Sequence, residues 1–140
     1  MGRILAIDYG TKRTGLAVTD PLRIVANGLD TVPTHELISF LEKYLAKETV
    51  DIIVFGLPKQ MSGAESESMK HIRPVVKKIQ EKFSEIELVY VDERFTSILA
   101  QKAMIEGGLK KKARQDKALV DKISATIILQ SYLESLNPSF

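Results

Sequence analysis

Acidic residues stand at the ends of apolar segments in separate parts of this 140-residue chain. Asp8 closes a first apolar segment, and Asp92 and Glu93 close another. Asp121 lies near the start of the last predicted helix, on the stripe that is expected to face the core. Carboxylates crowded together repel one another unless a cation is present. Such a cluster suits two-metal hydrolysis of phosphodiester bonds, in which two ions about 4 Å apart activate water and stabilise the leaving oxygen.

Each acid taken alone also has a structural interpretation. Asp8 can simply mark the point where a strand meets solvent, and Asp121 can be a first-turn acid favoured by the helix dipole. Asp92 and Glu93 can form an exposed turn that pairs with Arg94. The nuclease interpretation therefore depends on whether the fold brings these side chains to one place. The stripe expected to share the buried face with Asp121 comprises Ala125, Leu129 or Ile128, Tyr132 and Leu136.

Basic residues occur where a phosphate could be held. The turn 8–15 contains Gly10 and Gly15, which allow backbone amides to approach a phosphate closely. The loop 56–63 follows a predicted strand, and the basic stretch 110–117 immediately precedes the last predicted helix, where it can hold a polyanion. An ordinary hairpin turn and solvated loops are the alternatives. The basic candidates for nucleic-acid binding in these segments are Lys12, Arg13, Lys59, Lys110, Lys111, Lys112 and Arg114.

The composition is that of one folded domain and narrows the choice of metal. Hydrophobic residues make up 44% of the chain and charged residues 27%, which excludes a disordered protein. The net charge of +2 excludes a highly basic coating protein. Without cysteine, and with only His35 and His71, the sequence favours a metal held by oxygen, Mg²⁺ or Mn²⁺. No segment has the pattern of a signal peptide or a membrane span, so we expect a soluble cytoplasmic protein with no membrane partner.

Apolar runs and helical periodicity alternate along the chain and predict an α/β domain. Thr34 is expected to cap a first helix, and a second spans 69–83, where Pro74 must either kink the helix or mark its first turn. A third helix is expected from Thr96 to Gly107-Gly108, and a last one over about 118–136. The expected strands are 3–8, 15–19, 24–32, 51–57 and 87–91.

The connections between these segments predict how the strands are arranged. The first three strands follow one another as hairpins and should be antiparallel, whereas the last two are reached over helices and should be parallel to the first. The carboxyl ends of parallel strands open into the crevice where ligands bind. Asp8 and the pair Asp92-Glu93 would meet there, and Asp121 would join them from the helix above.

Four sequence motifs are spread over nearly the whole chain, and together they form a pattern that is specific for one protein family. They are Ile7–Asp20, Gly56-Leu57-Pro58 with Met61 and Gly63, Asp92–Thr96, and Val120–Leu133. In this order they resemble the YqgF family, also called the RuvX type of Holliday-junction resolvase or pre-16S rRNA nuclease. The chain departs mildly from the family pattern at Ser62, which replaces an acid, at Ser124, which replaces an alanine, and at Pro74.

The resemblance implies a ribonuclease H-like fold in a single domain over residues 1–140. The sheet would be mixed and five-stranded, in the order 3-2-1-4-5 with strand 2 antiparallel, and flanked by helices. The resemblance also implies that Asp8, Glu93 and Asp121 are the catalytic residues and the ligands of Mg²⁺ or Mn²⁺. Asp92 would be a further ligand or a support, and Arg94 would position the neighbouring acids or bind a phosphate of the nucleic acid.

The implied function is that of a metal-dependent nuclease on structured RNA or branched DNA. It would process the 5′ end of pre-16S rRNA or, alternatively, cleave Holliday junctions. RNA processing is favoured because a junction resolvase needs a symmetric dimer with two matched sites; the sequence leaves monomer and homodimer open. The turn 8–15 also resembles the first phosphate loop of the actin, sugar-kinase and heat-shock ATPase superfamily, which closes two such domains around a nucleotide. A non-catalytic nucleic-acid or ribosome-assembly factor on the same scaffold is a further alternative.

Overall fold

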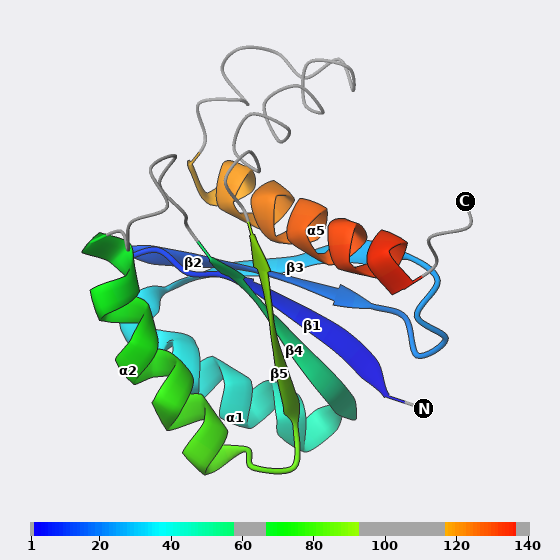
Figure 1. Ribbon diagram of the computed structural model, residues 1–140, viewed down its shortest axis with the longest axis horizontal. Coiled ribbons are helices and arrows are strands. Elements are labelled where there is room, and N and C mark those ends of the chain that lie inside the picture. Colours follow the sequence, from blue (N-terminus) through cyan, green and yellow to red (C-terminus); the bar gives the residue numbers. More distant parts are fainter. Residues whose placement is uncertain (1, 58–66, 93–116, 137–140) are drawn as a thin grey trace.

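A computed structural model describes residues 2–57, 67–92 and 117–136, which form one sheet with helices on both faces (Figure 1). The expected strands are all present, with small shifts at their ends. In chain order the elements are β1 (Arg3–Asp8), β2 (Arg13–Thr19), β3 (Ala26–Pro33), the 3-10 turn η1 (Thr34–Glu36), α1 (Leu37–Lys47), β4 (Val50–Leu57), α2 (Glu67–Lys82), β5 (Glu87–Asp92) and α5 (Lys117–Leu136).

The sheet has the strand order β3-β2-β1-β4-β5, which confirms the predicted topology. β2 is antiparallel to both β1 and β3, whereas β4 is parallel to β1 and β5 is parallel to β4. β1, β4 and β5 therefore end on the same side of the sheet, at Asp8, Leu57 and Asp92. We call this side the carboxyl edge.

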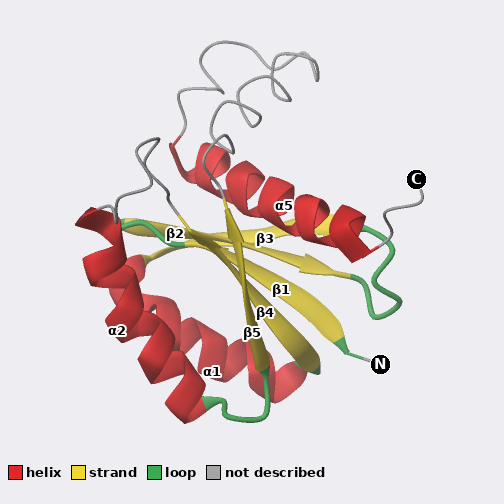
Figure 2. Cartoon of the chain, in the orientation of Figure 1, coloured by secondary structure: helices red, strands yellow, loops and turns green. Residues whose placement is uncertain are grey.

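The two faces of the sheet are covered by different helices. α5 lies on one face, and α1 and α2 lie on the other (Figures 1 and 2). Alternation along β1 sends Ile4 and Ala6 into the core under α5, and Leu5 and Ile7 into the core under α1 and α2. β1 is apolar almost throughout because both of its faces are buried. Of the described helices, none is long and apolar enough to cross a bilayer.

The start of α1 differs from the prediction. Thr34 does not cap a helix: it lies in η1, and neither η1 nor α1 has a side-chain hydrogen bond at its N-cap. The physical reason is that the Thr34 hydroxyl already donates a hydrogen bond to the carbonyl of Gly10, on the turn after β1. The residue therefore joins two loops and leaves the first turn of α1 without a capping side chain.

The structure decides one open question on the helices and corrects one expectation. α2 begins at Glu67, so Pro74 lies inside the helix and does not mark its first turn. Leu136 is 49% exposed because the buried stripe of α5 ends at Leu133, which is 6% exposed. The expected third helix over 96–108 lies outside the described residues.

Candidate active site

Asp8 stands at the carboxyl edge between two glycines. It is the last residue of β1, half-buried, and alternation along the strand assigns it to the α5 face, after Ile4 and Ala6. Its partner on β2 is Gly15. On β4, Gly56 comes one residue after Phe55, which pairs with Ile7 of β1. The residues directly opposite Asp8 on both neighbouring strands are thus glycines.

The close approach of α5 to β2 brings Asp121 to the same place. A Cβ atom added to Gly15 would overlap the backbone carbonyl of Asp121, so only glycine lets the helix lie this close to the strand. The Thr31 hydroxyl of β3 donates a hydrogen bond of 2.6 Å to the carbonyl of Ala118, which fixes the start of α5. Asp8 pairs with Gly15 and Asp121 packs on Gly15, so two of the three predicted catalytic acids are neighbours of one residue.

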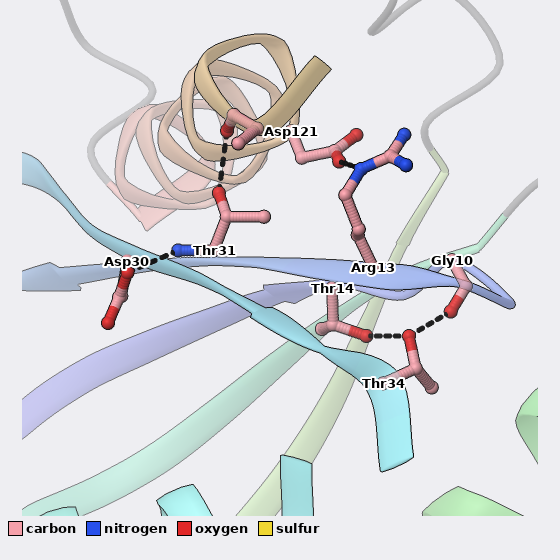
Figure 3. A network of polar contacts seen from close by, with 8 residues as sticks. Gly10, Arg13, Thr14, Asp30, Thr31, Thr34 and Asp121 are labelled. Carbon is pink, nitrogen blue, oxygen red and sulfur yellow. Dashed lines mark hydrogen bonds and ion pairs between the residues drawn. The ribbon is translucent and has the colours of Figure 1, made fainter. Parts of the chain in front are cut away.

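Arg13 forms an ion pair with Asp121 across this junction. Its Nε lies 2.9 Å from Oδ2 of Asp121, and the two side chains are 38% and 25% exposed (Figure 3). The pair fixes one carboxylate oxygen, while the terminal nitrogens of the guanidinium point away from Asp121 (Figure 3). The sequence indicated Arg13 as a basic residue of the turn, but nothing in it identified this partner.

A hydroxyl relay holds the turn that follows Asp8. Because the Thr34 hydroxyl donates to the carbonyl of Gly10, the Thr14 hydroxyl must donate to the Thr34 oxygen, 2.9 Å away (Figure 3). The Thr34 amide also donates to the carbonyl of Lys12 at 3.0 Å. Sequence analysis missed Thr14 and Thr34 as site residues, because it assigns Thr14 to the turn 8–15, whereas in the structure Thr14 lies in β2 and is fully buried. The relay leaves Lys12 exposed on a fixed turn.

Some predicted site residues are not brought to this junction by the described part of the chain. Asp92 ends β5 at the carboxyl edge, where it pairs with Leu57 of β4. The others lie outside the described residues: Lys59, Glu93, Arg94, Lys110, Lys111, Lys112 and Arg114.

The donor chemistry at the junction suits a hard divalent ion. Asp8 and Asp121 offer carboxylate oxygens, the ligands that Mg²⁺ and Mn²⁺ prefer. Within residues 2–57, 67–92 and 117–136, no group of three or more acidic, histidine or cysteine side chains gathers around a common point. The described residues therefore fit such an ion by donor type, and a complete site needs a ligand from elsewhere in the chain.

Comparisons with known proteins agree with this fold. A family model described as "RuvX: Holliday junction resolvase" matches residues 2–135. A protein of Bacteroides thetaiotaomicron is 63% identical over 135 residues, covering 96% of this chain and 98% of that protein. A protein of Phocaeicola vulgatus is 64% identical over 135 residues, covering 96% and 97%. Both carry the name "Putative pre-16S rRNA nuclease".

A solved structure shows the fold class. It is "T. thermophilus RuvC in complex with Holliday junction substrate", with a TM-score of 0.58 and 15% sequence identity, covering 98% of this chain and 96% of that chain. Similarity at this level of identity concerns the fold, and it confirms the ribonuclease H-like architecture.

Proposed function

This chain belongs to the RuvX Holliday junction resolvase family, and from this membership we propose that it is a metal-dependent nuclease whose site lies at the carboxyl edge of the sheet. As a member, the protein is a hydrolase acting on phosphodiester bonds. The single observation that supports the location is the junction at Gly15, which pairs with Asp8 on one side and lies against the backbone of Asp121 on the other. Carboxylates contributed by separate elements suit the ligand set of two-metal hydrolysis.

We assign separate roles to the residues of the junction. Asp8 and Asp121 bind the divalent ions, Mg²⁺ or Mn²⁺, through carboxylate oxygens. Arg13 holds one oxygen of Asp121, so that the other is presented to the ion, and the terminal nitrogens of its guanidinium donate to a phosphate of the substrate. When bound, the ions supply an activated water and stabilise the leaving oxygen.

Glu93 is our candidate for the remaining ligand, with Asp92 ranked behind it. Val89 and Val91 of β5 pack in the core under α5, on the face to which Asp8 is assigned. Glu93 stands two positions beyond Val91 in the sequence, and side chains of a strand alternate with a period of two. This spacing favours Glu93 over Asp92 as the partner of Asp8. Arg94 and the basic stretch 110–117, together with Lys12 and Lys59, are proposed to hold the nucleic acid.

We propose that the substrate is precursor 16S rRNA, processed at its 5′ end. Relatives at 63% and 64% identity over nearly the whole chain carry that RNA in their names. Because ribosomal RNA precursors are processed where ribosomes assemble, we place the protein in the cytoplasm. The description of the matching family supports a second candidate, cleavage of Holliday junctions in DNA.

A cleavage assay tests the function and separates the two substrates. Wild type, Asp8→Asn and Asp30→Asn are each incubated with a 5′-extended 16S rRNA fragment and with a four-way DNA junction, with Mg²⁺, Mn²⁺ or chelator. Asp30 is an exposed acid on β3 and serves as the matched control. We expect wild type and Asp30→Asn to cleave the RNA only with metal, and Asp8→Asn to be inactive. Equal cleavage by Asp8→Asn and wild type would contradict the proposal, and junction cleavage without RNA cleavage would favour the second candidate.

A further inference from the structure

The middle of α2 concentrates basic side chains, whereas the acids of this helix, Glu67 and Glu81, stand near its two ends. Lys70, Arg73, Lys77 and Lys78 are all exposed, and no acidic residue occurs from position 68 to position 80. Lysine and arginine exceed acids by only two over the whole chain, 20 against 18, so this helix concentrates positive charge. We call these four residues the α2 basic face.

The neighbouring helix shows what an ordinary solvated face looks like. α1 exposes Lys43 and Lys47, but it also exposes Glu42, which pairs with Lys82 of α2 at 2.7 Å. Surface helices that only face solvent commonly mix both signs in this way. Lys82 is thus neutralised by Glu42. In α2 the exposed Glu81 stands next to the C-terminal end of the α2 basic face, and the four basic residues still outnumber the two acids of their helix, Glu67 and Glu81.

The spacing of the α2 basic face matches a polyanion. Lys70, Arg73 and Lys77 are separated by three and four positions, so they lie in one row along the helix. At 1.5 Å per residue the row is about 10 Å long. A nucleic-acid strand rises about 3.4 Å per phosphate, so a row of this length spans about three phosphates. Lys70 and Arg73 also have interactions within the protein, and the row carries three positive charges.

The position of α2 connects this face with the candidate active site. α2 follows β4, which ends at the carboxyl edge, and it packs on the opposite face of the sheet from α5 (Figure 1). From that edge the helix runs back along the sheet (Figure 1). A nucleic acid that crosses the carboxyl edge can therefore continue along α2.

We propose that the α2 basic face binds the phosphate backbone of the nucleic-acid substrate on the side of the sheet away from α5. This inference rests on the proposed function, because it takes nucleic acid as the partner. The face contacts backbone and reads no bases, so its contribution to affinity is electrostatic and falls as salt rises. Its role is to hold the flanking part of a structured substrate while the carboxyl edge acts on the scissile bond.

Salt-dependent binding provides the test. Binding of a fluorescein-labelled RNA hairpin with a 5′ single-stranded extension is measured by anisotropy in EDTA, over a range of KCl concentrations, for wild type, Lys77→Gln/Lys78→Gln and Lys43→Gln/Lys47→Gln. Both variants remove two exposed lysines from a helix, and glutamine keeps the helix propensity of lysine. Circular dichroism verifies that each variant is folded.

We expect the α2 variant to bind more weakly, with the slope of log Kobs against log[salt] reduced in size by about 0.7 to 0.9 for each phosphate that the variant no longer neutralises. The α1 variant should keep the wild-type slope. If the α2 variant keeps the wild-type slope, or if both variants show the same reduction, the proposal is wrong, and an acidic protein becomes the better candidate partner for this face. Wild-type cleavage with an unchanged α2 slope would refute this inference alone. Wild-type binding with no metal-dependent cleavage would refute the proposed function alone.

Discussion

The two faces of the sheet are built from side chains of different size near the carboxyl end of β1. The α5 face carries Gly15, Ala6 and Ala17, and α5 meets them with Ala125. The opposite face carries large residues such as Leu5, Ile7, Leu16 and Phe55, which pack against α1 and α2. Small residues let the backbone of α5 touch β2, and this contact brings Asp121 to Gly15, the β2 partner of Asp8. Small side chains thus allow the close approach of α5 on one face, whereas large side chains form the apolar core on the other.

Gly15→Ala should have the largest effect, because its Cβ meets the backbone of α5, which cannot move without displacing Asp121. We expect cleavage to fall by about 100-fold or more, as for a misplacement of about 1 Å in a catalytic group. Overpacking should also lower the free energy of unfolding by about 1–3 kcal/mol. The measurements are cleavage rates and urea denaturation.

Gly28→Ala is the matched control for that substitution. Its Cβ would lie 2.8 Å from Cγ of the Lys122 side chain, which can move aside. We expect near wild-type activity and stability. Equal losses at Gly15 and Gly28 would show that the contact with the helix backbone has no special role.

Leu41→Ala tests the role of the core on the opposite face of the sheet. Leu41 of α1 is fully buried in the core under α1 and α2. We expect the free energy of unfolding to fall by about 2–5 kcal/mol, the usual cost of truncating a buried leucine. The folded fraction should keep its specific activity, because α1 does not position the acids. A large loss of specific activity in protein verified as folded would contradict the division between the faces.

Arg13→Ala tests the ion pair at the junction. An ion pair of this exposure stabilises the fold by at most about 1 kcal/mol, so Tm should change little. The rate of cleavage should fall by about 10-fold, because Asp121 loses its orientation and a phosphate loses its donors. Arg13→Lys should not restore the rate, since lysine lacks the planar fork that serves both partners. Full rescue by lysine would show that only the positive charge matters.

Protonation of Asp20 should have the smallest effect of these changes, because it is expected to affect only one turn. It precedes the turn between β2 and β3, and hydrogen bonds from the amides of Val25, Ile24 and Leu22 hold the pKa of Asp20 below its ordinary value of 3.8. A lowered pKa in the folded state means that these hydrogen bonds stabilise the turn above pH 3.8 and are lost as pH falls through the folded pKa. The three amide NMR signals should therefore shift together with a midpoint below pH 3.8. Shifts centred above that value would contradict this account.

The sheet could be predicted because each of its strands is specified by a short stretch of sequence. Apolar runs of four or more residues define β1 and β4, and the order of hairpins and helices fixes their neighbours. The acids at the strand ends could be predicted for the same reason. The contacts between distant residues that complete the site could not be predicted from the sequence. The Arg13–Asp121 pair joins residues 108 positions apart and depends on how closely α5 approaches Gly15.

Thr34 shows a second limit of sequence reasoning. A threonine before a helical pattern predicts an N-cap, yet its hydroxyl bonds Thr14 and Gly10. Choosing between the two requires knowing that the turn after β1 lies beside the end of β3. Glu93 and the basic residues of 110–117 stay predictions.

The most direct test is whether the acids at the carboxyl edge bind a common ion site. Isothermal titration with Mn²⁺ is performed on wild type, Asp8→Asn, Asp121→Asn and Glu134→Gln, the last being an exposed acid on the same helix as Asp121. We predict wild-type affinity for Glu134→Gln and a loss of at least about 10-fold for each Asn variant, since even outer-shell changes cost about 10–100-fold. Wild-type Mn²⁺ binding by both Asn variants would contradict the account.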